Sequence, residues 1–239
     1  MPITLDDFVA RSLEIRDPNA LKAYFQEAMK AAGFDCVLYR HIAELFRKVP
    51  LDKSCRIDTF PKAWTERYAA QRYFDDDPLI NETRRRGTPF RWFDLEERGD
   101  LTPRQKAFFV DLRAAGFVDG VAAPVFSRPG DIAYFGLSAT AAPIEATDGA
   151  LLELQAICQQ MHVRYAMLTS PADAPTLSPR ETEVLQLIAQ GLSNADIAER
   201  LAVSTHTIDT LVRRCFEKLG VSTRVEAALS AIGRGLILP

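Results

Sequence analysis

The stretch that decides the fold is LSPRETEVLQLIAQGLSNADIAERLAVSTHTIDTLVRRCFEKLGVSTRVEAALSAIGRGLI, residues 177–237. It predicts four short helices that end near Gly191, after Leu201, before Gly220 and at Gly235. Two short helices joined by a tight turn are typical of a helix-turn-helix. Each helix is preceded by a side chain that can cap its first turn, and two of these caps form a capping box with a glutamate: Ser178, Ser193, Ser204 and Thr223.

The third of these helices, residues 205–218, has an apolar stripe and a polar face. The stripe, Ile208, Val212, Cys215 and Leu219, repeats at spacings of four, three and four, which predicts a core contact. The opposite face suits the major groove of DNA, where arginine bonds two acceptors of guanine and a helix N-terminus approaches phosphate. We expect Arg213 to read bases and Lys218 and Arg224 to contact phosphate, within a candidate set of Thr205, His206, Asp209, Thr210, Arg213, Arg214, Lys218 and Arg224.

The alternative for this stretch is a small helical bundle with no DNA role. Residues 177–239 contain seven basic and seven acidic side chains, so their overall charge does not attract DNA. Binding would therefore depend on local clustering of the basic side chains and on dimerisation.

The same stretch resembles the DNA-binding domain of LuxR-type transcription factors over its whole length. Glu181, Leu185 and Gly191 stand at the family's signature positions. The resemblance implies binding to double-stranded DNA as a homodimer, with RNA polymerase as a further candidate partner. Leu211 replaces a common histidine and Arg214 a common asparagine, so the backbone contacts depart from the usual pattern.

The chain of 239 residues, 47% of them hydrophobic, suits one medium and one small domain. We place the domains at residues 1–168 and 177–239, joined by a polar linker at 169–176 that two prolines stiffen. The four cysteines are widely spaced, as in a cytoplasmic protein with reduced thiols. No membrane-length apolar run, zinc spacing or catalytic histidine spacing occurs, so neither an enzyme nor a metal or cofactor is expected.

The N-terminal part combines helix signals with one hairpin signal. Helices are predicted at 18–30, from Pro61, at 78–87 and at 104–115, with a strand at 36–39. Two apolar runs, 121–126 and 132–138, flank the turn Ser-Arg-Pro-Gly-Asp and predict an antiparallel hairpin. Helices that flank an antiparallel sheet make an α/β sandwich.

Four residues between positions 60 and 92 suggest a pocket. Trp64 and Tyr68 lie four apart on one helix face, and Asp77 and Trp92 follow. Three large aromatics with one carboxylate would make a mostly apolar small-molecule site with a single ionic anchor. The alternative is that the aromatics are core and that Asp77 merely caps the helix that begins at Pro78.

These residues resemble the signature of the acyl-homoserine-lactone-binding domain that precedes the LuxR-type DNA-binding domain. The resemblance implies that Trp64 donates to the lactone carbonyl, that Asp77 accepts from the ligand amide, and that Tyr68 and Trp92 enclose the ligand. Ser138 resembles a family hydroxyl that contacts the amide carbonyl. The matching positions are Trp64, Tyr68, Asp77, Pro78, Trp92 and Gly120.

Phe60 departs from that pattern, because several family members have a tyrosine there whose hydroxyl bonds an acyl carbonyl. We count Phe60 among the ligand-binding candidates. The missing hydroxyl favours an aryl or branched acyl group over a long β-keto chain.

Two other patterns are open to more than one interpretation. The helix after Thr147 carries an apolar stripe that would be a core face or a dimer contact, and the resemblance favours dimer contact. The basic run Arg84–Arg86 is interpreted as a solvated helix face. The stripe comprises Leu151, Leu154, Cys158, Met161, Tyr165 and Leu168.

Three other functions compete with a lactone-sensing regulator. A phosphorylated response regulator would need Asp6, Asp7, Asp58 and Lys106 in its acidic and lysine positions, but Lys106 precedes alanine within a predicted helix. A lactone-degrading enzyme would need a nucleophile elbow or a metal cluster, which the sequence lacks. A LuxR-type regulator that acts without a lactone ligand remains the main alternative.

Overall fold

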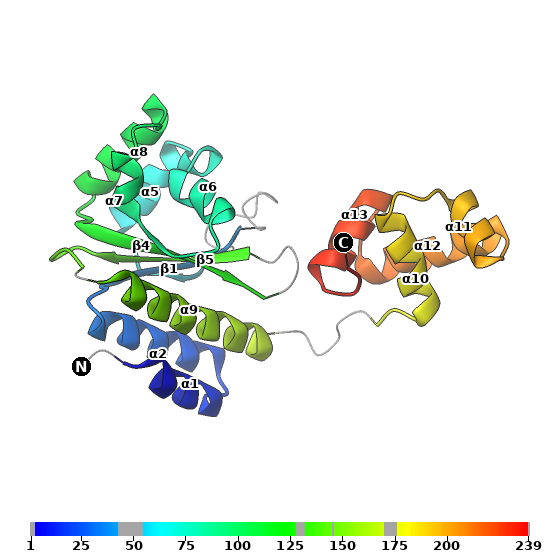
Figure 1. The fold of residues 1–239 in the computed structure, drawn as a ribbon, viewed down its shortest axis with the longest axis horizontal. Coiled ribbons are helices and arrows are strands. Elements are labelled where there is room, and N and C mark those ends of the chain that lie inside the picture. Colours follow the sequence, from blue (N-terminus) through cyan, green and yellow to red (C-terminus); the bar gives the residue numbers. More distant parts are fainter. Residues whose placement is uncertain (1–2, 43–54, 128–131, 145, 170–175, 239) are drawn as a thin grey trace. The chain divides into compact units, whose positions relative to one another are not determined.

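The computed structural model describes residues 3–42, 55–127, 132–144, 146–169 and 176–238. They form two compact units, whose boundary in the sequence lies between Thr169 and Ser170 (Figure 1). Each unit is described by itself. No helix in these ranges combines the length and apolar composition needed to cross a bilayer.

The N-terminal unit is built on a five-stranded antiparallel sheet of order β2-β1-β5-β4-β3. The central pair, β4 and β5, is in register from Asp119↔Ala139 to Phe126↔Ile132, which confirms the predicted hairpin. Most of its turn, residues 128–131, lies outside the described residues. The strands are β1 (Cys36–His41), β2 (Cys55–Asp58), β3 (Phe90–Arg91), β4 (Asp119–Phe126) and β5 (Ile132–Ala139).

Helices cover both faces of this sheet, as the α/β sandwich prediction requires (Figure 1). On one face lie α1 (Leu5–Glu14), α2 (Pro18–Ala31) and α9 (Asp148–Thr169). The other face carries α5 (Lys62–Ala70), the short 3-10 helix η1 (Tyr73–Asp75), α6 (Pro78–Arg85), α7 (Trp92–Glu97) and α8 (Pro103–Ala114). Each face of the sheet has its own apolar core. Because side chains alternate along a strand, Phe135 of β5 packs in the core with α1, α2 and α9, and Tyr134 packs in the core with α5 to α8.

The apolar stripe of α9 is part of the core of its own unit. Leu151, Leu154, Cys158, Met161 and Tyr165 are at most 9% exposed and pack with β4, β5 and α2 in one cluster. The expectation that this stripe is a dimer contact is therefore wrong. The periodicity marked a buried face correctly, but it did not show which surface covers that face.

The C-terminal unit contains the four predicted helices: α10 (Pro179–Ala189), α11 (Asn194–Leu201), α12 (Thr205–Leu219) and α13 (Arg224–Gly233). Capping boxes begin three of them, and Ser204 caps α12 by accepting from the Thr207 N–H. Gly220 ends α12 at a φ of 67°, a left-handed conformation that glycine adopts without steric cost. The core stripe of α12 is buried as predicted.

Candidate ligand pocket and nucleic-acid interface

A cavity lies between the sheet and the helices α5 to α8. It encloses about 530 Å³ not filled by protein atoms, part of it open to solvent, but only about 50 Å³ admits the centre of a water molecule. The cavity is therefore narrow in this conformation, and a lactone with an acyl chain would have to displace its walls. The lining residues are Leu38, Arg40, Asp58, Phe60, Trp64, Thr65, Tyr68, Asp77, Leu79, Ile80, Trp92, Phe108, Leu112 and Tyr134.

Asp77 is the buried carboxylate of this cavity and is 6% exposed. Its Oδ1 accepts from the Leu79 and Ile80 N–H groups at 2.8 and 3.3 Å, and its Oδ2 accepts the Tyr68 hydroxyl at 2.7 Å. Burial raises the pKa of Asp77, and these three hydrogen bonds oppose that shift. Asp77 thus caps α6, as the alternative interpretation held, and also faces the cavity.

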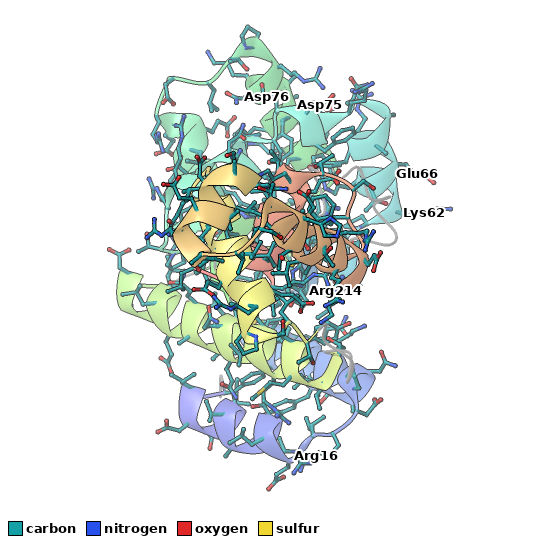
Figure 2. All side chains as sticks on the ribbon, turned by 90° about the vertical axis from the view of Figure 1, so that its right-hand side faces the viewer. Arg16, Lys62, Glu66, Asp75, Asp76 and Arg214 are labelled. Atoms are coloured by element: carbon teal, nitrogen blue, oxygen red, sulfur yellow. The ribbon has the colours of Figure 1, made fainter. Side chains whose placement is uncertain are left out.

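Six of the fourteen residues that line the cavity are aromatic. Trp64 and Tyr68 come from the inner side of α5, and their ring centroids are 5.8 Å apart. The outer side of α5 carries the exposed ion pair between Lys62 and Glu66, both labelled in Figure 2. Phe60 lies at the start of this segment, with its centroid 6.0 Å from that of Trp92. The structure therefore brings the predicted aromatics to one site.

Two buried donors on this side of the sheet have no hydrogen-bonding partner among the described residues: Trp92 Nε1 and Ser138 Oγ. Trp92 is fully buried at the start of α7. Ser138 pairs with Cys36 across the β1–β5 register, so its hydroxyl faces the Cys36 thiol. Such donors are unfavourable when buried unless an acceptor reaches them.

Three of the eight candidate residues do not line the cavity. Pro78 is buried at the first position of α6, and Ser138 lies on the same sheet face without touching the cavity. Gly120 lies beneath Trp92, because a Cβ added there would meet Trp92 Cε3 at 2.2 Å. The contribution of Pro78 and Gly120 would be to position the wall.

The polar face of α12 is open to solvent in the C-terminal unit. Arg213 and Arg214 are exposed, as are Thr205, His206 and Asp209, whereas Thr210 is half-buried. Figure 2 shows the side chains of this helix, with Arg214 labelled. A helix with one buried stripe and an exposed face that carries arginine has the shape and chemistry of a major-groove reader.

Both units match described protein families. The autoinducer binding domain matches residues 17–165, and the bacterial regulatory proteins of the luxR family match residues 175–231. The chain belongs to the LuxR family. It is a transcriptional regulator with an autoinducer-binding domain and a LuxR-type helix-turn-helix.

Individual proteins agree with this membership. The transcriptional activator TraR of Agrobacterium vitis is 26% identical over 226 residues, 92% of this chain and 93% of TraR. An HTH-type transcriptional regulator of Sinorhizobium fredii is 29% identical over 181 residues, and this match spans only 55% of that protein. Escherichia coli SdiA shares the fold, with a TM-score of 0.76 at 20% identity and 98% coverage of both chains.

Two of the candidate DNA-binding residues of this LuxR-family chain are used inside their own unit. Lys218 Nζ donates to Glu181 Oε2 at 2.7 Å and to the Thr176 carbonyl at 3.0 Å. Arg224 donates to Asn194 Oδ1 at 2.6 Å and to the Leu192 carbonyl. Their charged groups therefore already help to hold the helices together, and contact of Lys218 and Arg224 with phosphate stays a prediction.

Nine of the cavity residues lie outside the candidate set, and two of these nine have polar groups and are almost fully buried. Arg40 is 4% exposed on β1, and Tyr134 is 3% exposed on β5. The sequence carried one signal for Arg40, because it stands two residues from Leu38 in an apolar strand and must share that face. The sequence carried no such signal for Tyr134, since an aromatic residue in a buried strand most often belongs to the core.

Proposed function

We propose that this LuxR-family chain is a quorum-sensing regulator that binds an acyl-homoserine lactone in the cavity and a palindromic operator as a homodimer. The observation that carries the proposal is the meeting of Asp77, Trp64 and Tyr68 on one cavity wall. An amide N–H aimed at the Asp77 carboxylate would stabilise a buried charge that is otherwise unfavourable.

The two carbonyl groups and the amide N–H of such a ligand each have a candidate partner. Trp64 would donate its indole N–H to the lactone carbonyl, and Asp77 would accept from the amide N–H. Tyr68 and Trp92 would enclose the ligand, and Ser138 would donate to the amide carbonyl once the wall has moved. Among the described residues, the Ser138 hydroxyl faces the Cys36 thiol, a weak hydrogen-bonding group, and the stronger acceptor that a ligand carbonyl offers supports this role.

The acyl group is proposed to be aryl or branched, because Phe60 offers a ring without a hydroxyl. Its centroid lies 5.1 Å from Phe117 and 6.0 Å from Trp92, so an aryl acyl group would extend an existing aromatic cluster. A long β-keto chain would gain no hydrogen bond from Phe60 itself.

Dimerisation is proposed through apolar side chains that remain exposed on two helices. Val225 and Leu229 lie four apart on α13 and are 68% and 64% exposed. On α9, the outer side carries Leu152 and Met167, which are 53% and 64% exposed. Apolar side chains at helical spacing on a surface are typical of protein contacts.

The test is the melting temperature of the full chain with and without a panel of acyl-homoserine lactones. A ligand that binds only the folded state at 100 times its Kd stabilises it by about 2.7 kcal/mol. Asp77→Asn should abolish the rise, because the asparagine oxygen keeps the α6 cap while its NH₂ group opposes the ligand amide N–H. Asp17→Asn is the matched control, since Asp17 caps α2 from the other side of the sheet.

A regulator that acts without a lactone is the second candidate function, and the narrow cavity favours it. The aromatic wall already packs closely, with Trp64 contacting Tyr68, Phe108 and Phe117 at centroid distances of 5.5 to 5.8 Å. A melting temperature that no lactone changes would support this alternative. Mass spectrometry of small molecules that copurify from the native host would then show whether another ligand is present.

A further inference from the structure

The sheet wall of the cavity has a polar corner made by Arg40 and Tyr134. These residues are direct partners in the β1–β5 register, so their side chains project side by side from the same face. Both line the cavity and both are almost fully buried. A guanidinium and a phenol therefore lie side by side in a cavity wall that also carries the Asp77 carboxylate.

Gly136 makes room for the Tyr134 side chain. A Cβ at Gly136 would lie 2.5 Å from the Tyr134 hydroxyl oxygen and 3.4 Å from Phe60 Cζ. The Tyr134 hydroxyl thus lies over Gly136, and the tip of the Phe60 ring reaches the same point. A phenolic hydroxyl from β5 therefore lies near the tip of the Phe60 ring, which itself carries none.

Arg40 gives this corner a positive charge, which opposes the rise that burial causes in the pKa of Asp58 and of Asp77. Its guanidinium carbon lies 5.9 Å from the centroid of Tyr68, whose hydroxyl is bonded to Asp77. The Asp77 carboxylate already accepts three hydrogen bonds, from Tyr68, Leu79 and Ile80. A guanidinium carries five N–H donors, and each oxygen that reaches it in a buried site stabilises it.

Resting on the proposed function, we infer that Arg40 and Tyr134 bind an oxygen atom on the acyl group of the ligand. The lactone carbonyl and the amide N–H have their own partners in Trp64 and Asp77, which leaves the acyl group for the sheet wall. The surrounding rings of Phe60, Trp92 and Phe108 suit an aryl group. The ligand class is therefore an aryl-acyl-homoserine lactone with a hydroxyl on its ring.

The experiment compares phenylacetyl-homoserine lactone with its ortho-, meta- and para-hydroxylated forms by calorimetric titration of the full chain. The best hydroxylated form should bind wild type about 10- to 100-fold more tightly, as for a hydrogen bond to a charged group. Arg40→Met and Tyr134→Phe should each reduce that preference, the ratio of the two Kd values measured on the same variant, at least severalfold.

Two further variants separate this inference from general damage to the fold. Gly136→Ala should also lose the preference, because its Cβ displaces the Tyr134 hydroxyl. Tyr24→Phe should retain it, since Tyr24 packs on Phe8 at the other face of the sheet. Circular dichroism spectra would establish that each variant is folded.

The outcomes distinguish the two proposals. Equal affinity of wild type for all four compounds, or an unchanged preference in folded Arg40→Met and Tyr134→Phe, would overturn the oxygen subsite and leave lactone binding intact. If wild type bound neither these compounds nor straight-chain lactones, the proposed function would be wrong, and the subsite would fall with it.

Discussion

Gly120 is glycine because the ring of Trp92 occupies the position where any other residue would place its Cβ. An alanine Cβ would lie 2.2 Å from Cε3 and 2.3 Å from Cδ2 of Trp92, a residue that is fully buried. Since neither the strand nor the ring has space to move, Gly120→Ala should destabilise the N-terminal unit by about 3 kcal/mol, at the upper end for overpacking. Thermal melting measures this loss.

Gly149 provides the matched control for that substitution. An added Cβ there would have Thr147 Oγ1 at 3.8 Å as its nearest neighbour, and Gly149 lies in the first turn of α9. Gly149→Ala should therefore leave stability unchanged or raise it by up to about 1 kcal/mol. Similar losses from both variants would show that the contact with Trp92 does not explain glycine at position 120.

Asp77 predicts a pH dependence of ligand binding. Burial raises its pKa above the ordinary 3.8, so the folded chain takes up this proton at a higher pH than the unfolded chain. The contribution of this group to the free energy of unfolding is fully present below pH 3.8, and it is lost as the pH rises through the raised pKa of the folded chain. Ligand binding has the opposite sign, because the amide N–H needs the ionised carboxylate.

The lactone-induced rise in melting temperature should therefore shrink as pH falls toward the raised pKa of Asp77. Melting series over pH, with and without lactone, measure both effects. Asp77→Asn should show no such contribution to the pH dependence of stability. A ligand-induced rise that is constant down to pH values near 3.8 would argue against an ionic anchor.

Among the elements, those with local end signals were predicted best from the sequence. The helices α10 to α13 each begin at the predicted cap, and α12 ends at Leu219 before a left-handed Gly220. The helices α1 and α7 were not predicted, and neither were the strands β2 and β3, because strands of four and two residues have no periodicity of their own. Their conformation depends on pairing with distant parts of the chain.

The residues of the candidate site that share one helix could be predicted from the sequence, whereas those that face them from the sheet could not. The spacing of Trp64 and Tyr68 identified one wall of the cavity, since residues four apart share a helix face. Which side chains face them from the sheet depends on the pairing of β1 with β5, which no local pattern gives. Arg40 and Tyr134 were therefore missed, and the ligand contacts of the candidate set remain predictions.

Two side chains of α12 should have different effects when they are replaced, because Arg213 is exposed and Lys218 is bonded to Glu181 within its own unit. Arg213→Ala should cost about 1–3 kcal/mol at the specific operator and relax preference at one position in each half-site, without lowering stability. Lys218→Ala should instead lower stability, because Glu181 would lose a charged partner while only 3% exposed. Competition shift assays at fixed salt and melting curves measure the two effects, and unchanged operator discrimination in Arg213→Ala would contradict this orientation.

The exposed apolar pair on α13 predicts a contact between two copies. Leu229→Glu should shift sedimentation toward monomer and weaken operator binding at least tenfold, because a charge would have to be buried in the contact. Val110→Glu on α8 is the control, since Val110 is equally exposed at 63% on the other unit. An equal effect of both substitutions would remove α13 from the contact.

For the whole molecule, dimerisation should fix the geometry of the operator. Two recognition helices that read one face of DNA require half-sites about one helical turn apart, roughly 34–36 Å. Inserting about five base pairs, half a turn, between the half-sites should abolish binding, whereas inserting a full turn should restore part of it. Binding that is indifferent to spacing in a shift assay would indicate that monomers bind independently.

The hydrogen bond from Lys218 to the Thr176 carbonyl connects the start of the C-terminal unit to α12. The side chain near the end of α12 holds the backbone of the residue that leads into α10, and Glu181 Oε2 anchors the same ammonium group 2.7 Å away. A displacement that arrives along the chain at residue 176 therefore acts on α12 through Lys218 and on α10 through Glu181 at the same time. Lys218 thus connects the residue that leads into the C-terminal unit directly to α12, the helix proposed to read DNA.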